Sequence, residues 1–112
     1  MSAELAARVL ARGVSFGSAN FTLRRLVLSE GEPPRFAAVV SKKILPHAVD
    51  RNYLRRKIYN AIRKSTPSPT ARIAIMIFPK KSATTLPFAV LSAEIFSLLQ
   101  KINTVIPAKA GI

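Results

Sequence analysis

Residues 51–64 read RNYLRRKIYNAIRK, and this stretch indicates both how the chain folds and what it binds. Its apolar residues recur at i, i+4, i+7 and i+8, the spacing of one helix face: Leu54, Ile58, Ala61 and Ile62. At roughly 100° per residue, its polar and cationic residues share an adjacent arc: Arg51, Asn52, Arg55, Arg56, Tyr59 and Arg63. We therefore expect a helix that buries one face and presents guanidinium groups on the next.

The cations of this arc indicate a polyanionic partner. Neighbouring like charges on a helix destabilise it by a few tenths of a kcal/mol per pair, so the cluster needs a compensating ligand. Arginine presents a planar fork of donors that fits phosphate and also stacks on bases. The whole chain carries 18 Lys and Arg against 5 Asp and Glu, a net charge of +13. This balance favours a nucleic acid or an anionic membrane surface over an acidic protein.

Length and composition predict a single domain. The chain has 112 residues, of which 49% are hydrophobic, enough for one modest core. We expect the domain to span residues 1–102 and residues 103–112 to form a disordered tail, because Pro107 and Gly111 interrupt any periodicity. There is no cysteine and one histidine, His47, so a metal site built on those residues is improbable. The lack of cysteine suits a cytoplasmic protein, and no stretch approaches the roughly 20 apolar residues of a membrane span.

Periodicity along the chain predicts an α+β order of elements. A helix at residues 3–12 should end at Gly13, and Pro33 and Pro34 mark a turn before an apolar run that looks like a central strand. The remaining expected elements are strand material at 14–28, the strand at 35–41, the basic helix at 46–64, a Pro- and Ser-rich loop at 65–70, a buried strand at 72–79 and a helix from Pro87 to residue 102.

These elements predict a two-layer α–β sandwich in which two helices pack on one face of a small, mostly antiparallel sheet. The strand at 35–41, the basic helix and the strand at 72–79 form a βαβ unit. The general rule for such a crossover between parallel neighbours is right-handed.

The sequence around the basic helix resembles that of the bacterial ribonuclease P protein component. That family has a strand ending in Ser-Lys-Lys, then a helix with an Arg-Asn-x-x-Lys-Arg core. Here the strand ends in Ser41-Lys42-Lys43 and the helix carries Arg51-Asn52 and Arg55-Arg56. Arg55 stands where the family usually has Lys, and Tyr59 where it usually has Arg. The resemblance extends in the right order over nearly the whole chain.

The resemblance implies a fold, an activity and partners. The βαβ crossover would be left-handed, an exception to the general rule. The protein would be the accessory subunit of an endoribonuclease whose catalyst is the partner RNA, and that RNA with its substrate would hold the Mg²⁺ ions. The protein itself would supply no catalytic residue and no metal ligand. It would hold the 5′ leader of precursor tRNA in a cleft between the sheet and the basic helix and support removal of the leader.

The resemblance also implies site residues. Lys42 and Lys43 would lie near the catalytic RNA and the leader, and Phe16 and Phe21 would lie in the strand region that lines the leader cleft. From the residues alone, a core position stays open for both phenylalanines and is the more common role of such residues. Contacts to the catalytic RNA are expected from Arg51, Asn52, Arg55 and Arg56, with Arg63 on the same arc.

The side chains of the aromatic residues leave two interpretations open. For Tyr59, stacking on a base and partial packing against the neighbouring strand are both consistent with the pattern. We read the other phenylalanines as core residues: Phe36, Phe78, Phe88 and Phe96.

Three rival functions are weaker. A plain RNA-binding module without a processing role explains the charge but not the Ser-Lys-Lys to Arg-Asn spacing. A protein-only nuclease is disfavoured because the five acids are scattered, without the close spacing of a metal-binding carboxylate motif. A membrane-surface binder needs exposed apolar area that the basic helix uses for the core.

Overall fold

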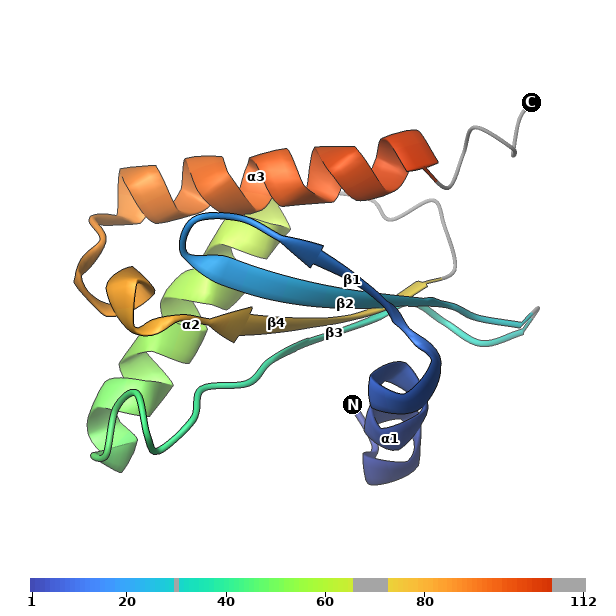
Figure 1. The fold of residues 1–112 in the computed structure, drawn as a ribbon, viewed down its shortest axis with the longest axis horizontal. Coiled ribbons are helices and arrows are strands. Elements are labelled where there is room, and N and C mark those ends of the chain that lie inside the picture. Colours follow the sequence, from blue (N-terminus) through green and yellow to red (C-terminus); the bar gives the residue numbers. More distant parts are fainter. Residues whose placement is uncertain (30, 66–72, 106–112) are drawn as a thin grey trace.

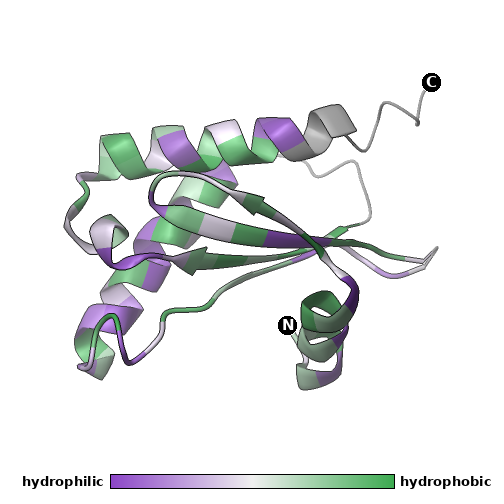
Figure 2. Cartoon of the chain, in the orientation of Figure 1, coloured by the Kyte–Doolittle hydropathy of each residue, from purple (hydrophilic) through white to green (hydrophobic). Residues whose placement is uncertain are grey.

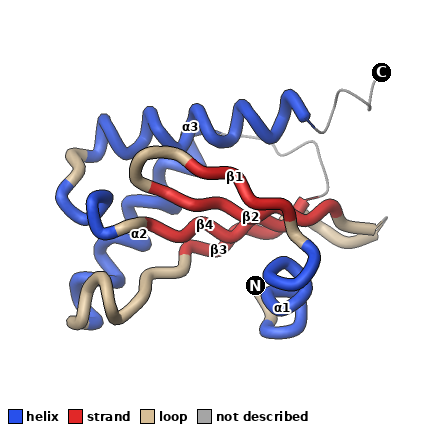
Figure 3. The backbone as a smooth tube through the Cα atoms, viewed as in Figure 1, coloured by secondary structure: helices blue, strands red, loops and turns tan. Residues whose placement is uncertain are grey.

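The computed structural model describes residues 1–29, 31–65 and 73–105, which form three α-helices, one 3₁₀ helix and a four-stranded sheet (Figures 1 and 3). In chain order the elements are α1 (Ala3–Arg12), β1 (Val14–Gly17), β2 (Phe21–Val27), β3 (Arg35–Ala38), α2 (Ala48–Ser65), β4 (Ile73–Pro79), η1 (Lys81–Thr85) and α3 (Phe88–Val105).

The sheet has the strand order β1-β2-β4-β3. β1 pairs with β2 and β2 with β4 in antiparallel fashion, while β3 and β4 are parallel neighbours joined through α2. The predicted α+β class, the mostly antiparallel sheet and the βαβ unit are therefore confirmed. The left-handed crossover stays a prediction from the family resemblance.

One strand position was predicted wrongly. The apolar run at 35–41 was expected to form a central strand, but β3 lies at the sheet edge and β4 is central. The reason is that β4 is apolar on both faces, with residues 73–77 all buried, whereas β3 is only four residues long and begins with the exposed Arg35. Figure 2 shows the hydrophobic colour of β4 between its neighbours.

The main core lies between the sheet and the helices α2 and α3. Side chains alternate along a strand, so Ile73, Ile75 and Ile77 of β4 point to this face. They pack in one cluster with apolar residues of both helices, which confirms that two helices cover one face. The helix residues in this cluster are Leu54, Ile58, Ala61 and Ile62 of α2 and Leu91, Ile95, Leu98 and Leu99 of α3.

The second face of the sheet is covered in part by α1. Val9 of α1 is fully buried in a smaller cluster with Leu28, Ala74 and Met76. The Arg24 guanidinium donates to backbone carbonyls at the end of α1, including that of Leu10 at 3.0 Å, which satisfies acceptors that the helix leaves open. Its other carbonyl partners are those of Val9 at 3.2 Å and Gly13 at 2.7 Å.

One helix ends where the sequence predicts and another continues beyond its predicted end. Gly13 ends α1 as predicted, and a Cβ there would lie 2.4 Å from the Val9 carbonyl oxygen, so no other residue fits without displacement. α3 continues to Val105, three residues beyond the predicted domain end. Residues 106–112 of the predicted tail and residues 66–70 of the predicted loop lie outside the described residues.

Glu94 of α3 holds the turn between β1 and β2. Its carboxylate accepts from the Asn20 backbone N–H at 2.7 Å, from the Asn20 side-chain amide at 2.6 Å and from the Ser18 hydroxyl. Burial raises the pKa of Glu94, but the hydrogen bonds from Ser18 and Asn20 together lower it by more. The net pKa of Glu94 therefore lies below the ordinary glutamate value. The ionised carboxylate therefore stabilises the packing of α3 against the β1–β2 turn.

Replacing Glu94 with glutamine should lower the free energy of unfolding by about 1 kcal/mol at pH 7, because the turn donors lose a charged acceptor. Since the folded-state pKa of Glu94 is lowered, its contribution is present above the ordinary carboxyl pKa of about 4.3 and is lost as the pH falls through the lower folded value. Urea denaturation of both proteins at pH 7, 5 and 3 should show a difference that shrinks toward pH 3. A difference that stays constant over that range would contradict this role.

Candidate nucleic-acid interface

α2 presents the predicted arc of polar residues, here called the basic face: Arg51, Asn52, Arg55, Arg56, Tyr59 and Arg63. Asn52, Arg56 and Arg63 are exposed, whereas Arg51, Arg55 and Tyr59 are half-buried. The opposite stripe is buried in the main core, and Figure 2 shows hydrophilic segments along α2. The sequence thus correctly divided this helix into a buried and a charged face.

Arg51 joins α2 to the loop that precedes it. One of its terminal nitrogens donates to the carbonyls of Leu45 and Pro46 at 2.9 and 2.8 Å. This loop, residues 39–47, is the long tan segment between β3 and α2 in Figure 3. Arg51 therefore has a structural task in addition to its charge, and its remaining N–H groups can still meet a phosphate.

The loop presents Lys42 and Lys43 to solvent. The Ser41 hydroxyl accepts from the Lys43 backbone N–H at 3.0 Å, and the Ser41 carbonyl accepts from the N–H groups of Ile44 and Leu45 at 3.1 Å. This tight turn leaves both lysines exposed. The predicted lysines thus lie just before the basic face.

Tyr59 covers the open edge of the sheet. Its hydroxyl accepts from the Ala38 backbone N–H of β3 at 3.0 Å, and its ring packs against the main core. An edge strand leaves such N–H groups without a strand partner, so this contact satisfies one of them. Of the two interpretations of Tyr59, packing on the neighbouring strand is confirmed, while stacking on a base stays a prediction.

Two further arginines of the basic face meet amides. Arg55 donates to the side-chain oxygen of Asn52, and Arg63 donates to that of Asn60. In the described part of the chain, an arginine pairs with a carboxylate only at Arg8 of α1 and Glu32 of the turn before β3. The charge of the basic face is therefore held in place by neutral partners and remains available to an anion.

Phe21 requires a correction. Its side chain has 0% exposure and lies in the main core, so it cannot contact a leader in this fold. Leu54 and Ile58 of α2 also fill the centre of the layer between the sheet and the basic helix, together with Ile75 and Ile77. A leader cleft on this side of the sheet stays a prediction for its half-buried margin.

Phe16 lies on the same side of the sheet as Phe21. It pairs with Leu23 of β2 and packs against the main core, with the Arg25 guanidinium carbon 5.5 Å from its ring centroid. Because it is only half-buried, a contact between Phe16 and a leader stays a prediction.

The second face of the sheet is more accessible at the end away from α1. Thr22 and Phe78 are direct cross-strand partners on this face, and Val39 continues the pairing of β3 by donating to the Ile77 carbonyl at 2.9 Å. The side chains of Thr22, Val39 and Phe78 are all half-buried. Because β3 and β4 run parallel, their carboxyl ends share one edge, and Lys42, Lys43 and Lys80 follow these ends. Figure 1 shows α1 near the opposite end of the strands.

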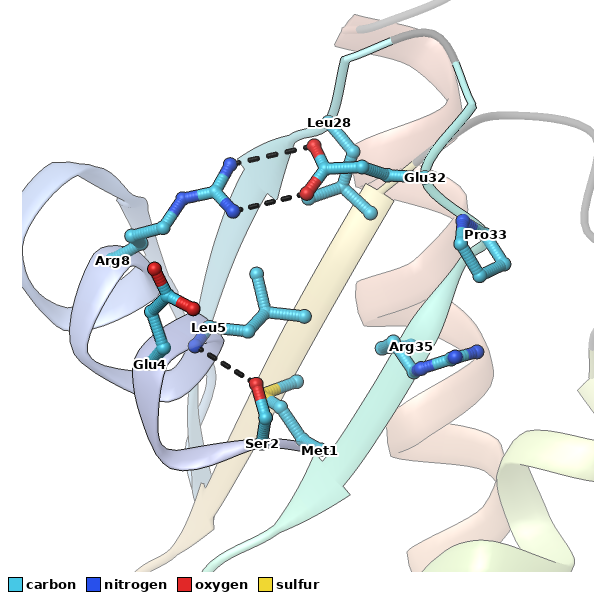
Figure 4. A pocket seen from close by; sticks show the side chains of 9 residues that line it. All are labelled: Met1, Ser2, Glu4, Leu5, Arg8, Leu28, Glu32, Pro33 and Arg35. Atoms are coloured by element: carbon cyan, nitrogen blue, oxygen red, sulfur yellow. Dashed lines mark hydrogen bonds and ion pairs between the residues drawn. The ribbon is translucent and has the colours of Figure 1, made fainter.

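A hollow of about 340 Å³ lies where α1 meets the turn before β3 (Figure 4). Arg8 donates to both carboxylate oxygens of Glu32 at 3.0 and 3.4 Å, and Arg35 lies on the strand side. The hydrogen bond from Arg8 lowers the pKa of Glu32. This hollow carries both signs of charge, and its ion pair ties α1 to the turn.

Of the four phenylalanines predicted to be core residues, Phe36, Phe78 and Phe88 are half-buried and pack against the two core clusters, whereas Phe96 is exposed, contrary to the prediction. Phe96 is 45% exposed and Phe88 is half-buried. The buried stripe of α3 runs through Leu91, Ile95 and Leu98; Phe88 continues this stripe toward the start of the helix, whereas the Phe96 ring lies on its flank. The sequence contains the signal for the exposure of Phe96, because at 100° per residue its side chain points well away from that of Ile95.

The described residues contain no group of three or more His, Cys, Asp or Glu side chains placed to hold a metal ion. Within the same residues no helix combines the length and the apolarity of a membrane span. His47 is exposed at the start of α2.

A family model described as Ribonuclease P matches residues 5–103. The chain belongs to that family. It is similar to the RNase P protein from Thermotoga maritima, with 19% identity, a TM-score of 0.75 and coverage of 86% of this chain and 89% of that chain. It is also similar to Staphylococcus aureus RNase P protein, with 22% identity, a TM-score of 0.74 and coverage of 91% and 92%. At these identities the structures support the shared fold.

Family membership gives the coarse function. The chain is an accessory protein subunit of ribonuclease P, the endoribonuclease complex that matures the 5′ ends of tRNA. The predicted family and the predicted class of activity are thereby confirmed.

Proposed function

We propose that the chain binds the catalytic RNA of ribonuclease P through the basic face of α2 and the loop before it. The observation that carries this proposal is a helix side with four arginines, of which Arg51, Arg55 and Arg63 donate to neutral carbonyl or amide oxygens and Arg56 is exposed. The proposed contacts are Lys42, Lys43, Arg51, Asn52, Arg55, Arg56, Tyr59 and Arg63.

The physical contribution of this face is electrostatic. Each arginine or lysine that neutralises a phosphate releases condensed counterions, so affinity falls steeply with salt. Charge alone gives binding without specificity. The Asn52 amide, which both donates and accepts, and the fixed shape of the loop behind Arg51 supply recognition of one RNA surface.

We further propose that the 5′ leader of precursor tRNA lies on the second face of the sheet, beside Phe78 and Val39. A single strand favours an aromatic platform for its bases and cations for its phosphates. Phe78 offers the ring, and Lys42, Lys43 and Lys80 follow the ends of the adjoining strands. Phe16, which the family resemblance implies, is the alternative contact on the other side of the sheet.

In this proposal the RNA is the catalyst, and it holds with its substrate the Mg²⁺ ions that activate the attacking water. The protein lowers the repulsion between two polyanions, so the complex forms at a lower Mg²⁺ concentration. It also adds leader contacts that a mature tRNA lacks. The site of action is the cytoplasm, where the partner RNAs are made.

The proposal is tested by cleavage of a leader-bearing precursor tRNA by a bacterial ribonuclease P RNA at low Mg²⁺, with and without this chain. Cleavage should be stimulated by the chain, and the chain alone should cleave nothing. Salt-sensitive RNA binding without stimulation would favour a plain RNA-binding module. Cleavage by the chain alone would favour a protein-only nuclease.

Replacing Arg56 with glutamine should weaken binding to ribonuclease P RNA and reduce the salt slope of log affinity by about 1, because one phosphate contact is lost. Arg56 is exposed, so the free energy of unfolding should stay within about 0.5 kcal/mol. Filter binding across a salt series measures the affinity and its salt slope, and urea denaturation measures the free energy of unfolding. Arg12→Gln on α1 is the matched control and should leave the slope unchanged; an unchanged slope for Arg56→Gln would remove that phosphate contact.

Replacing Phe78 with leucine should weaken precursor tRNA binding by the holoenzyme about tenfold, the expected loss for one stacked base, and leave mature tRNA binding unchanged. Leucine keeps the apolar packing of this half-buried position. Phe16→Leu, measured in parallel, separates the two faces of the sheet. If only Phe16→Leu changes the ratio of precursor to mature tRNA affinity, the leader lies on the side of α3 instead.

A further inference from the structure

A groove runs between the carboxyl-terminal part of α2 and the first half of α3. It consists of two adjoining hollows of about 510 and 470 Å³ that share Lys64 and Phe88. Hollows of this size fall within the range of roughly 300–1,000 Å³ that is typical of ligand sites. Asn60 and Arg63 line the first hollow, and Phe96 lines the second.

The groove combines aromatic rings with cations. The Lys64 ammonium lies 5.2 Å from the centroid of the Phe88 ring, and Arg63 is exposed beside it. Phe96, two turns after Phe88 on the same side of α3, is 45% exposed. Among the described residues, those that line the two hollows include no acid.

The groove is continuous with the basic face of α2. Arg56, Asn60 and Arg63 follow one another at i, i+4 and i+7, so they lie along one side of the helix. Arg63 donates to the Asn60 side-chain oxygen at 2.5 Å, which fixes both residues at the entrance. An RNA strand on the basic face would therefore reach the groove without crossing an apolar or acidic surface.

We infer that this groove binds an unpaired stretch of RNA, with a base stacked on Phe96 and phosphates on Arg63 and Lys64. Duplex RNA keeps its base faces stacked inside the helix, so an exposed aromatic ring fits a single strand. The net charge of +13 and the continuity with the basic face favour RNA over an acidic peptide. The inference rests on the proposed function of the basic face, since that face brings the RNA to the groove.

The test uses the full chain and an eight-nucleotide uridine oligomer that contains one 4-thiouridine. Crosslinking followed by peptide mass spectrometry should place adducts in the peptide that carries residues 88–96. Fluorescence anisotropy should show that Phe96→Leu weakens binding of the oligomer about tenfold. Lys64→Gln should reduce the salt slope by about 1.

Two further variants keep the result interpretable. Val90→Ala changes another exposed apolar side chain of α3, 48% exposed and outside the groove, and should bind as the wild type does. Thermal unfolding should be similar for Phe96→Leu and Val90→Ala, because leucine retains most of the apolar contact at position 96.

The outcomes separate the groove from the basic face. Normal binding by Phe96→Leu, with adducts confined to other peptides and weakened binding by Arg56→Gln, would overturn the groove and leave the proposed function standing. If Arg56→Gln also bound RNA as the wild type does, both the groove and the proposed function of the basic face would be overturned. If Phe96→Leu instead abolished binding of a glutamate-rich helical peptide and left RNA binding unchanged, the groove would belong to a protein partner.

Discussion

The fold depends on the contact between the apolar stripe of α2 and the isoleucines of β4. Leu54 and Ile58 reach the same cluster as Ile75 and Ile77, and burying each such side chain contributes roughly 1.5–3 kcal/mol. This contact fixes the rotation of α2 about its axis. Once that rotation is fixed, the arginines on the adjacent arc can only face outward, and their mutual repulsion is tolerated because the apolar contact outweighs it.

The same contact explains which parts of the fold the sequence could predict. The period of 3.6 residues in α2 and the unbroken apolar run of β4 each allow one satisfactory environment, so both were identified correctly. The order of strands was less constrained: the run at 35–41 is as apolar as a central strand, and only the greater length and two-sided burial of β4 gave it the central position. A pattern along one strand carries little information on its neighbours.

The candidate site shows a similar limit at the level of side chains. The basic residues of α2 could be found because helical periodicity sets their direction. Phe21 could not be assigned in the same way, since in a strand a shift of one residue moves a side chain to the opposite face. The tasks of Arg24, Arg51 and Tyr59 depend on carbonyl and amide groups distant in the sequence or outside regular pairing. Such hydrogen bonds follow from tertiary packing and leave no local pattern.

Besides the basic face, two RNA surfaces are proposed, and each lies where a covering helix stops: the face around Phe78 beyond α1, and the groove beside Phe96 at the end of α2. The apolar platform around Phe78 exists because α1 is only ten residues long and cannot cover the whole second face of the sheet. The groove beside Phe96 lies where α2 ends against α3, and Phe96 borders it because the buried stripe of α3 leaves this ring on the exposed flank. A domain of this size has too few residues to cover both faces of its sheet completely. In a chain of net charge +13, the apolar surface that remains is bordered by cations, and that combination favours unpaired RNA over water or duplex.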